Sequence, residues 1–193
     1  MPILDVRSPS EYAHGHAPGA LSMPLFSDDE RAQVGICYKE QGQSAAIRLG
    51  LSLVGPKMAD LVAHADQHAS EGPLEVYCWR GGMRSQSVTW LLQTAGHAVK
   101  RWEGGYKAYR GRVLDSWCGG HPWVVLSGLT GSGKTEILRH MAAHAEVLDL
   151  EGLAHHKGSA FGHVGEDDQP TNEQFENEGA QCIQALDPSL PWW

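Results

Sequence analysis

The sequence lacks the features that mark secreted and membrane-spanning proteins. It has no membrane-length apolar run and no recognisable signal peptide. Its few cysteines are scattered and form no C-x-x-C pair, so neither a disulfide framework nor a zinc site is indicated. The four are Cys37, Cys78, Cys118 and Cys182. We therefore expect a cytoplasmic protein with reduced cysteines.

Excess positive charge is also lacking. The chain of 193 residues has 15 Lys and Arg against 23 Asp and Glu, a formal net charge of −8. This balance disfavours nonspecific binding of nucleic acid by the whole surface, but it leaves a local basic patch open.

Strand and helix patterns alternate along the first 118 residues. The pattern favours strands at 2–6, 20–25, 74–77 and 98–102, and helices at 7–12, at 27–54 with a break near Gly42, at 55–68 and at 85–92. Alternation of this kind predicts an α/β fold with a mainly parallel sheet. Ligands bind such folds at the carboxyl ends of the strands, and Cys78 lies at one of these ends.

The loop from Cys78 to Ser85 is the first candidate site. It reads Cys-Trp-Arg-Gly-Gly-Met-Arg-Ser, between a predicted strand and a predicted helix. The start of a helix directs backbone N–H groups and positive charge at one point, which favours a nucleophilic thiolate and binds anions. Around a catalytic Cys78, the predicted anion ligands are Arg80, Gly81, Gly82 and Arg84.

Two protein families use a cysteine loop of this kind. Asp5-Val6-Arg7, Glu11-Tyr12 and the segment 15–20 precede the loop as in rhodanese domains, which this half of the chain resembles. Such domains carry sulfur or selenium on the cysteine as a persulfide or its selenium analogue. The spacing C-x5-R also matches cysteine-dependent phosphatases, although Tyr77 stands where many of those enzymes have His. We favour chalcogen transfer over phosphate-ester hydrolysis, and an inert buried cysteine least.

A basic segment with interleaved aromatic residues follows at 100–112. Its charge suits contacts to phosphates, and its rings at 102, 106 and 109 suit base stacking. The alternative is a terminal helix whose aromatic side chains pack on the sheet. The candidate nucleic-acid contacts are Lys100, Arg101, Lys107, Arg110 and Arg112. A domain boundary is expected after residue 118, at a Gly-Gly-His-Pro sequence.

The second candidate site is a complete G-x-x-x-x-G-K-T motif at 128–135. A strand-like apolar run at 123–127 precedes it, and a helical pattern follows as far as Met141. The backbone of such a loop wraps phosphate oxygens, its lysine adds a point charge, and its threonine can ligate Mg²⁺. The predicted phosphate ligands are Gly128, Gly131, Ser132, Gly133, Lys134 and Thr135.

Weaker signals lie beyond the P-loop. A strand is expected at 146–150, where Asp149 and Glu151 either face substrate or Mg²⁺ or cap a helix. The polar, Gly-rich stretch 152–165 suits a substrate loop, in which His156 or Ser159 would contact a ligand.

Two further features limit the functions that the second half of the sequence can be predicted to have. His140 and His144 are spaced for one helix face, but no third ligand is apparent, so no metal site is predicted. Only 58 residues follow Thr135, and no later apolar strand ends in Asp. We therefore expect the P-loop half to be incomplete, with a rhodanese-like domain at 1–118 and a partial P-loop NTPase-like domain at 119–193.

Together, the two motifs resemble those of tRNA 2-selenouridine synthases. The match runs from Pro2 to about Pro188 and includes the cysteine loop, the P-loop and the segments 104–110 and 158–162. The resemblance implies that the wobble 2-thiouridine of tRNA receives selenium from selenophosphate. It also implies an S-geranylated intermediate made from geranyl diphosphate.

Residue roles follow from this resemblance. Cys78 takes the position of the family's essential cysteine, and its loop is expected to gather selenophosphate. The P-loop is expected to hold the diphosphate of geranyl diphosphate, with Mg²⁺ as a candidate cofactor and no structural metal. The basic residues of 100–112 become candidate tRNA contacts, and a sulfur or selenium donor protein is a further candidate partner.

Two other interpretations stay open. One is a plain rhodanese-type sulfurtransferase with an attached nucleotide-binding domain. The other is a truncated, inactive fragment that binds tRNA or phosphate.

Overall fold

The computed structural model describes residues 1–69, 72–120, 123–129, 131–158, 162, 165 and 167–187. The chain divides into two compact units, Met1–Arg110 and Gly111–Trp193. The division falls within helix α6, Gly105–Trp117, and the boundary predicted after residue 118 lies just beyond the end of that helix.

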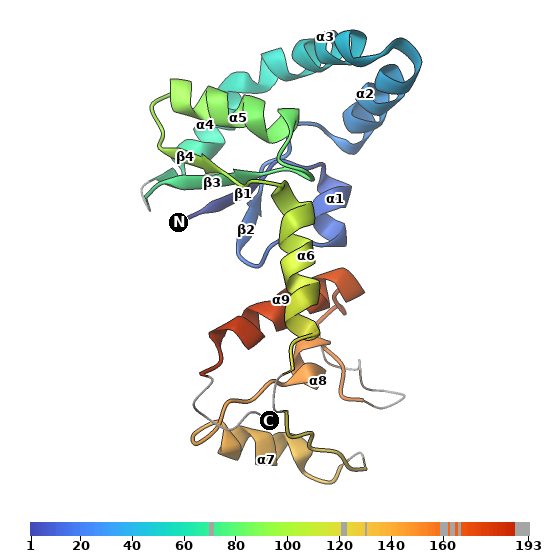
Figure 1. Ribbon diagram of the computed structural model, residues 1–193, viewed down its shortest axis with the longest axis vertical. Helices are drawn as coiled ribbons and strands as arrows, with labels where there is room; N and C mark the ends of the chain where they lie inside the picture. The colour runs from blue at the N-terminus through green and yellow to red at the C-terminus, as the bar shows by residue number, and fades with distance from the viewer. Residues whose placement is uncertain are drawn as a thin grey trace. The chain divides into compact units, whose positions relative to one another are not determined.

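The first unit is built on a parallel sheet of four strands (Figure 1). Its strands are β1 Ile3–Asp5, β2 Ala20–Ser22, β3 Leu74–Tyr77 and β4 Val99–Arg101. Their order in the sheet is β2-β1-β3-β4, and every neighbouring pair is parallel. The predicted α/β fold with a parallel sheet is confirmed.

Helices connect these strands largely where the sequence predicts them. They are α1 Pro9–His14, α2 Asp28–Gln41, α3 Gln43–Val54, the short 3-10 helix η1 Gly55–Lys57, α4 Met58–Asp66 and α5 Met83–Thr94. The expected break near Gly42 is confirmed, since this residue ends α2 with a φ of 86° that favours glycine.

The two faces of the sheet bury different side chains. Leu4 and Val76 face one side, where they pack with Val88 and Leu92 of α5 and with residues of α4. Tyr77 faces the other side with Tyr106 of α6. Figure 1 shows the corresponding arrangement, with α2 to α5 on one face and α6 on the other. The alternation follows from the two-residue period of a strand.

A buried ion pair lies at the carboxyl end of β1. The guanidinium of Arg7 is 1% exposed and donates to both carboxylate oxygens of Asp5, at 3.0 and 2.6 Å. It also donates to the carbonyl of Gly15 at 2.6 Å and lies 3.8 Å from the ring centroid of Tyr106. Every charge in this cluster therefore has a partner, which burial requires.

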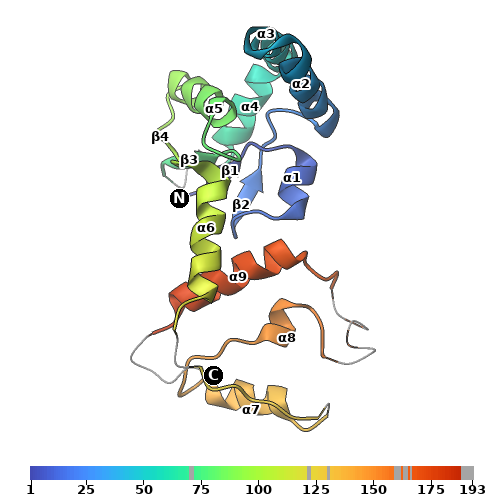
Figure 2. The ribbon, with the colours of Figure 1, turned by 45° about the vertical axis from the view of Figure 1, so that its right-hand side comes forward.

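The described residues of the second unit form the end of α6 and the helices α7 Lys134–Met141, α8 Leu150–Leu153 and α9 Asn172–Ala185 (Figure 2). Helix α9 packs closely against Trp117, whose ring stacks on Phe175 at 5.9 Å between centroids and whose Nε1 donates to the carbonyl of Glu176 at 2.9 Å. A side chain at Gly179 would overlap the ring of Trp117.

The strands predicted at 123–127 and 146–150 are wrong as regular strands. Among the described residues of this unit, only Trp123 and Glu146 have bridge geometry, and residues 124–129 have no regular structure. Two short extended segments that pair with no further strand form a sheet of only marginal stability, which explains why no regular strands are present in the part of this unit that the structure describes. Val125 and Leu129 are accordingly 81% and 85% exposed.

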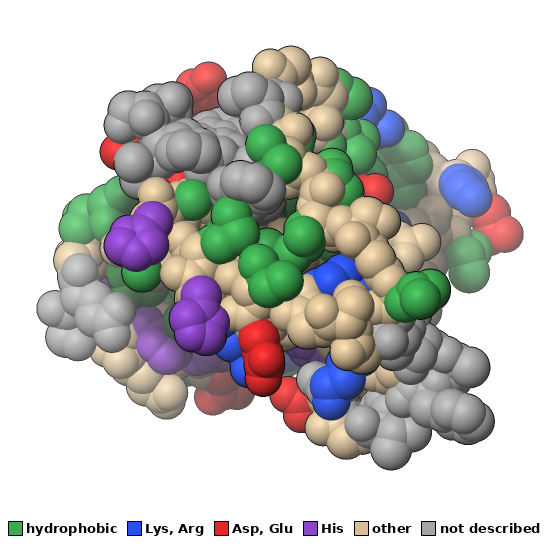
Figure 3. Space-filling view, turned by 90° about the horizontal axis from the view of Figure 1, so that it is seen from below, with side chains coloured by type: hydrophobic (Ala, Val, Ile, Leu, Met, Phe, Trp, Pro, Cys, Tyr) green, Lys and Arg blue, Asp and Glu red, His purple; other side chains and the backbone are tan. Residues whose placement is uncertain are grey.

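Apolar surface is also exposed on α7. Ile137 and Met141 line an open hollow of about 750 Å³ beside His140 and His144. Figure 3 shows hydrophobic and histidine side chains side by side on the surface. None of the helices in the described parts of the chain is both long and apolar enough to cross a membrane.

Replacement of Arg7 by Met should lower the free energy of unfolding by about 3–5 kcal/mol, because it leaves the buried Asp5 carboxylate unpaired. Urea unfolding, with hydrogen exchange of the β1 and β3 amides, measures this change. Arg31→Met is the matched control, since Arg31 is 51% exposed and lies 3.4 Å from its carboxylate partner; we expect about 0–1 kcal/mol there. Equal losses of stability in the two variants would show that the buried Arg7–Asp5 pair contributes no more to stability than an exposed ion pair.

Candidate functional site

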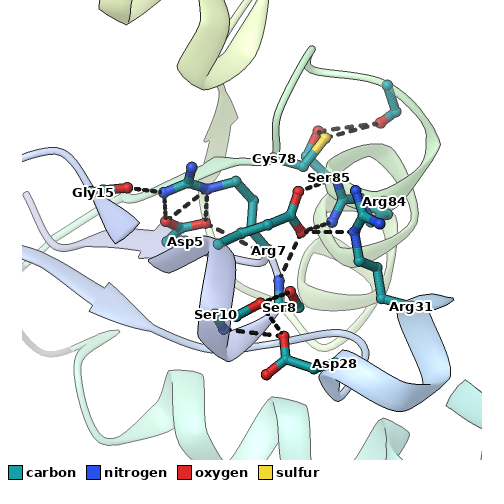
Figure 4. Close-up of polar contacts among 12 residues, drawn as sticks. Asp5, Arg7, Ser8, Ser10, Gly15, Asp28, Arg31, Cys78, Arg84 and Ser85 are labelled. Atoms are coloured by element: carbon teal, nitrogen blue, oxygen red, sulfur yellow. Dashed lines mark hydrogen bonds and ion pairs between the residues drawn. The ribbon is translucent and has the colours of Figure 1, made fainter. Parts of the chain in front are cut away.

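Cys78 lies directly after β3, at the carboxyl end of a central strand of the sheet. The residue is 3% exposed, and its Sγ lies 3.2 Å from Oγ of Ser85 and 3.9 Å from the carbonyl oxygen of Gly82 (Figure 4). The Ser85 hydroxyl is also 3.1 Å from that carbonyl. Because a hydroxyl proton can rotate, Ser85 can accept from a thiol or donate to a thiolate.

The cysteine loop ends where α5 begins. Gly82 is the residue that precedes the first turn, and α5 starts at Met83. The loop therefore lies at the positive end of a helix, as the sequence predicts. Gly81 has a φ of 65°, and a Cβ there would lie 2.7 Å from the carbonyl oxygen of Trp102, so only glycine fits.

The start of α6 holds the cysteine loop from the other side. The backbone N–H of Tyr106 donates to the carbonyl of Cys78 at 2.9 Å, and the N–H of Lys107 donates to the carbonyl of Trp79 at 2.8 Å. Gly105 has a φ of 59°, and a Cβ on it would lie 2.3 Å from the Cys78 carbonyl oxygen. The absence of a side chain at position 105 therefore permits the close contact.

The two predicted anion-binding arginines have different surroundings. Arg84 donates to both carboxylate oxygens of Glu11, at 2.6 and 3.3 Å (Figure 4). Arg80 is exposed and has no hydrogen bond or ion pair within the described residues. Of the two arginines, Arg80 is therefore the one whose donors are free for a bound anion.

Glu11 is a residue of the site that the sequence does not predict. Its carboxylate also accepts the backbone N–H of Ser8 at 3.1 Å and lies 3.4 Å from Nε of Arg31. Burial alone would raise the pKa of Glu11, but the hydrogen bonds and charge of Arg84, aided by Ser8 and Arg31, lower it to about 2. The carboxylate is therefore ionised at neutral pH.

The aromatic residues of the basic segment pack inside the first unit. Tyr106 is fully buried, and Trp102 stacks on Tyr77 with 4.6 Å between ring centroids. Base stacking by Tyr106 is thus a wrong expectation, and the alternative in which the aromatic side chains pack on the sheet is confirmed. The physical reason is that these rings cover the face of the sheet opposite α5.

The basic residues of this segment differ in their contacts. Lys107 and Arg112 are exposed, and Arg110 is half-buried. Lys100 is 74% exposed and lies 3.7 Å from Glu75. Arg101 donates to the carbonyl of Gly81 at 2.8 Å, so it braces the cysteine loop. Contact of these residues with tRNA stays a prediction.

The P-loop precedes α7 as the sequence predicts. Gly133 adopts a left-handed conformation with a φ of 82°, and α7 begins at Lys134. The ammonium group of Lys134 donates to the carbonyls of Gly128 and Leu129 at 3.0 and 3.1 Å. These loop carbonyls hold the lysine side chain at the loop, where a phosphate would lie. Thr130 lies outside the described residues.

A polar pocket of about 560 Å³ opens beside the P-loop. Asp149 lies in it and accepts the N–H of Gly152 at 3.0 Å, so the helix-cap interpretation of Asp149 is confirmed. Ser159 lies outside the described residues, whereas His156 lines the pocket. The other lining side chains are those of Lys134, Thr135, Glu136, Arg139, Glu151 and Lys157.

The residues of this pocket fit a phosphate ligand with Mg²⁺. Lys134, Arg139 and Lys157 supply positive charge for phosphate oxygens. The Thr135 hydroxyl and the carboxylates of Asp149 and Glu151 are oxygen ligands of the type that Mg²⁺ prefers. A second, more apolar pocket of about 530 Å³ shares Lys134, Thr135, Asp149 and Glu151 with the first.

Two protein-family models match the chain, one over the part with the cysteine loop and one over the part with the P-loop. The model of the rhodanese-like domain matches residues 1–112. The chain belongs to the rhodanese-like family. Residues 121–187 of this rhodanese-like chain match a second model, that of the tRNA 2-selenouridine synthase AAA domain.

Individual relatives extend the likeness over both motifs. The chain is 48% identical over 188 residues to the tRNA 2-selenouridine synthase of Bordetella bronchiseptica, covering 91% of this chain and 48% of the relative. For the synthase of Aeromonas salmonicida the identity is 44% over 183 residues, covering 92% and 48%. The resemblance to this family is confirmed, and the chain spans about half the length of these relatives.

A solved structure supports the fold. It is the N-terminal domain of a Clostridium difficile 630 protein described as ATP/GTP-binding, and it is 43% identical with a TM-score of 0.56. The match covers 58% of this chain and 88% of that domain.

Gly105→Ala should lower the free energy of unfolding by about 2–4 kcal/mol, because a left-handed backbone and an overlap with Cys78 are both penalised. Hydrogen exchange at the Tyr106 and Lys107 amides should become faster. Gly111→Ala is the matched control on the same helix, where a Cβ meets no atom within 4 Å; it should be neutral or stabilising by about 0.5–1 kcal/mol. If Gly105→Ala is as stable as the control, the close contact between Gly105 and the Cys78 carbonyl is not required for stability.

Proposed function

We propose that the chain takes part in converting the wobble 2-thiouridine of tRNA to 2-selenouridine, as a transferase with a rhodanese-type cysteine. The observation that carries the proposal is a continuous likeness to tRNA 2-selenouridine synthases across both the cysteine loop and the P-loop. A rhodanese-like domain alone would support only sulfur transfer. The attached P-loop motif favours the selenation reaction.

The two anion sites suit two anionic substrates. Geranyl diphosphate would bind at the P-loop, where Lys134, the backbone amides of 128–133 and a Mg²⁺ held by Thr135 would neutralise its diphosphate. This charge neutralisation would assist departure of diphosphate as the geranyl group moves to the sulfur of 2-thiouridine.

Selenophosphate would bind at the cysteine loop. Its donors would be the exposed guanidinium of Arg80 and the N–H groups of Gly81 and Gly82, which belong to the loop that follows Cys78. Arg84 would contribute only where Glu11 releases it. The exposed cations of 100–112, Lys100 and Lys107 among them, are the candidate contacts for the tRNA backbone.

A second candidate function is sulfur transfer without tRNA, which the rhodanese-like family match supports. Release of sulfur from thiosulfate at a rate indifferent to tRNA, selenophosphate and geranyl diphosphate would favour it over selenation.

Cys78→Ser should abolish selenation of 2-thiouridine tRNA, because a hydroxyl does not replace a thiolate as chalcogen carrier. Mass spectrometry of the wobble nucleoside after incubation with selenophosphate and geranyl diphosphate measures the product. Cys118→Ser, at an exposed free cysteine, is the control and should leave the amount of selenated product unchanged. Full selenation by the Cys78→Ser variant would refute the role of the thiolate.

Lys134→Ala should abolish geranylation of the tRNA but leave selenation of tRNA that has been geranylated beforehand. The loss is expected at about a hundredfold or more, as for other preorganised charges that bind a leaving group. Lys39→Ala, on the exposed surface of α2, is the control. Loss of only the selenation step in the Lys134 variant would assign the P-loop to the other substrate.

A further inference from the structure

The arginine of the C-x5-R loop is occupied by a carboxylate. Glu11, on α1, and Arg84, on α5, are 73 residues apart in the sequence but form a two-pronged ion pair, with distances of 2.6 and 3.3 Å (Figure 4). Both nitrogens at the end of the Arg84 fork are used by this carboxylate. A planar fork of this kind is what a loop-bound phosphate would otherwise engage.

The position of Glu11 is fixed from several sides. Its carboxylate accepts the Ser8 N–H that begins α1, and Arg31 approaches it from α2. The side chains of Glu11 and Arg84 are only 18% and 22% exposed, so water screens the pair weakly. The carboxylate therefore stays paired and charged at neutral pH.

This arrangement opposes the binding of phosphate through Arg84. A phosphate dianion at the loop would have to take the Arg84 fork from Glu11, and the freed carboxylate would repel the dianion at close range. We propose that Glu11 is a specificity-determining residue that prevents inorganic phosphate and phosphate esters from occupying the Cys78 loop through Arg84. Anions are thereby directed to Arg80 and the loop amides.

This role of Glu11 is separate from the proposed function, because it concerns the anions that the loop excludes. Glu11 acts through Arg84, so it is a positioning residue.

The test is protection of Cys78 from alkylation by inorganic phosphate. The protein is treated with iodoacetamide at increasing phosphate concentrations, and alkylation of Cys78 is followed by peptide mass spectrometry, with the exposed Cys118 as internal reference. In Glu11→Gln, the phosphate concentration that gives half protection should fall about tenfold relative to the unaltered chain, since one charged hydrogen-bond pair becomes available to the anion. Glutamine retains the acceptor for the Ser8 N–H, so α1 should stay intact.

Two further variants separate specificity from structure. Glu30→Gln is the matched control, because Glu30 likewise caps a helix start, at Ser27, and pairs with Lys57; it should leave half protection unchanged. In Glu11→Gln combined with Arg84→Met, the gain should disappear. An unchanged half-protecting concentration in folded Glu11→Gln, or a gain that persists without Arg84, would overturn the inference. Since no tRNA or selenium is involved, these results are independent of the test of the proposed function.

Discussion

The candidate site depends on one close contact, between the carbonyl of Cys78 and the backbone at the start of α6. Two N–H groups of that helix donate to the carbonyls of Cys78 and Trp79, and Gly105 leaves just enough space for them. The same loop is continuous with β3 on one side and α5 on the other. The cysteine is thereby fixed between three elements, each anchored to the sheet. Without the contact, its carbonyl and that of Trp79 would lose their partners.

Charge pairing around the sheet decides which cations remain for a ligand. Arg7 is committed to Asp5, Arg84 to Glu11, and Arg101 to the carbonyl of Gly81. These guanidinium groups are used to hold neighbouring segments of the chain in place, so they are not available to a ligand in solvent. Arg80, two residues after Cys78 in the sequence, is exposed. Of the two arginines in the loop, Arg80 is therefore the one that an anion could engage without displacing a carboxylate.

Much of the first unit could be predicted because its signals are local. The alternation of strands and helices, the break at Gly42 and the position of Cys78 after a strand all follow from periodicity and glycine conformation. The Glu11–Arg84 pair could not be predicted in this way, because it joins residues 73 positions apart whose facing depends on how α1 and α5 pack on the sheet. The aromatic residues near 106 were ambiguous for a related reason: an aromatic residue between cations suits both nucleic acid and a core.

The structure of the second unit follows less directly from its sequence. Its P-loop and α7 follow from a motif of fixed spacing, and both lie where expected. The flanking apolar runs predict strands by composition, yet a strand needs neighbours to pair with, and the described residues provide only isolated bridges. Strand propensity indicates that a segment is compatible with a sheet, but it does not show that neighbouring strands are present to form one.

The proposed function requires that Cys78 accept a chalcogen atom. Incubation with thiosulfate, followed by peptide mass spectrometry without reductant, tests it most directly. The thiolate would attack the outer sulfur of thiosulfate and release sulfite, so we expect a mass gain of one sulfur atom on the Cys78 peptide and none on the Cys118 peptide. An unmodified Cys78, or sulfur on Cys118 alone, would show that Cys78 is not the acceptor.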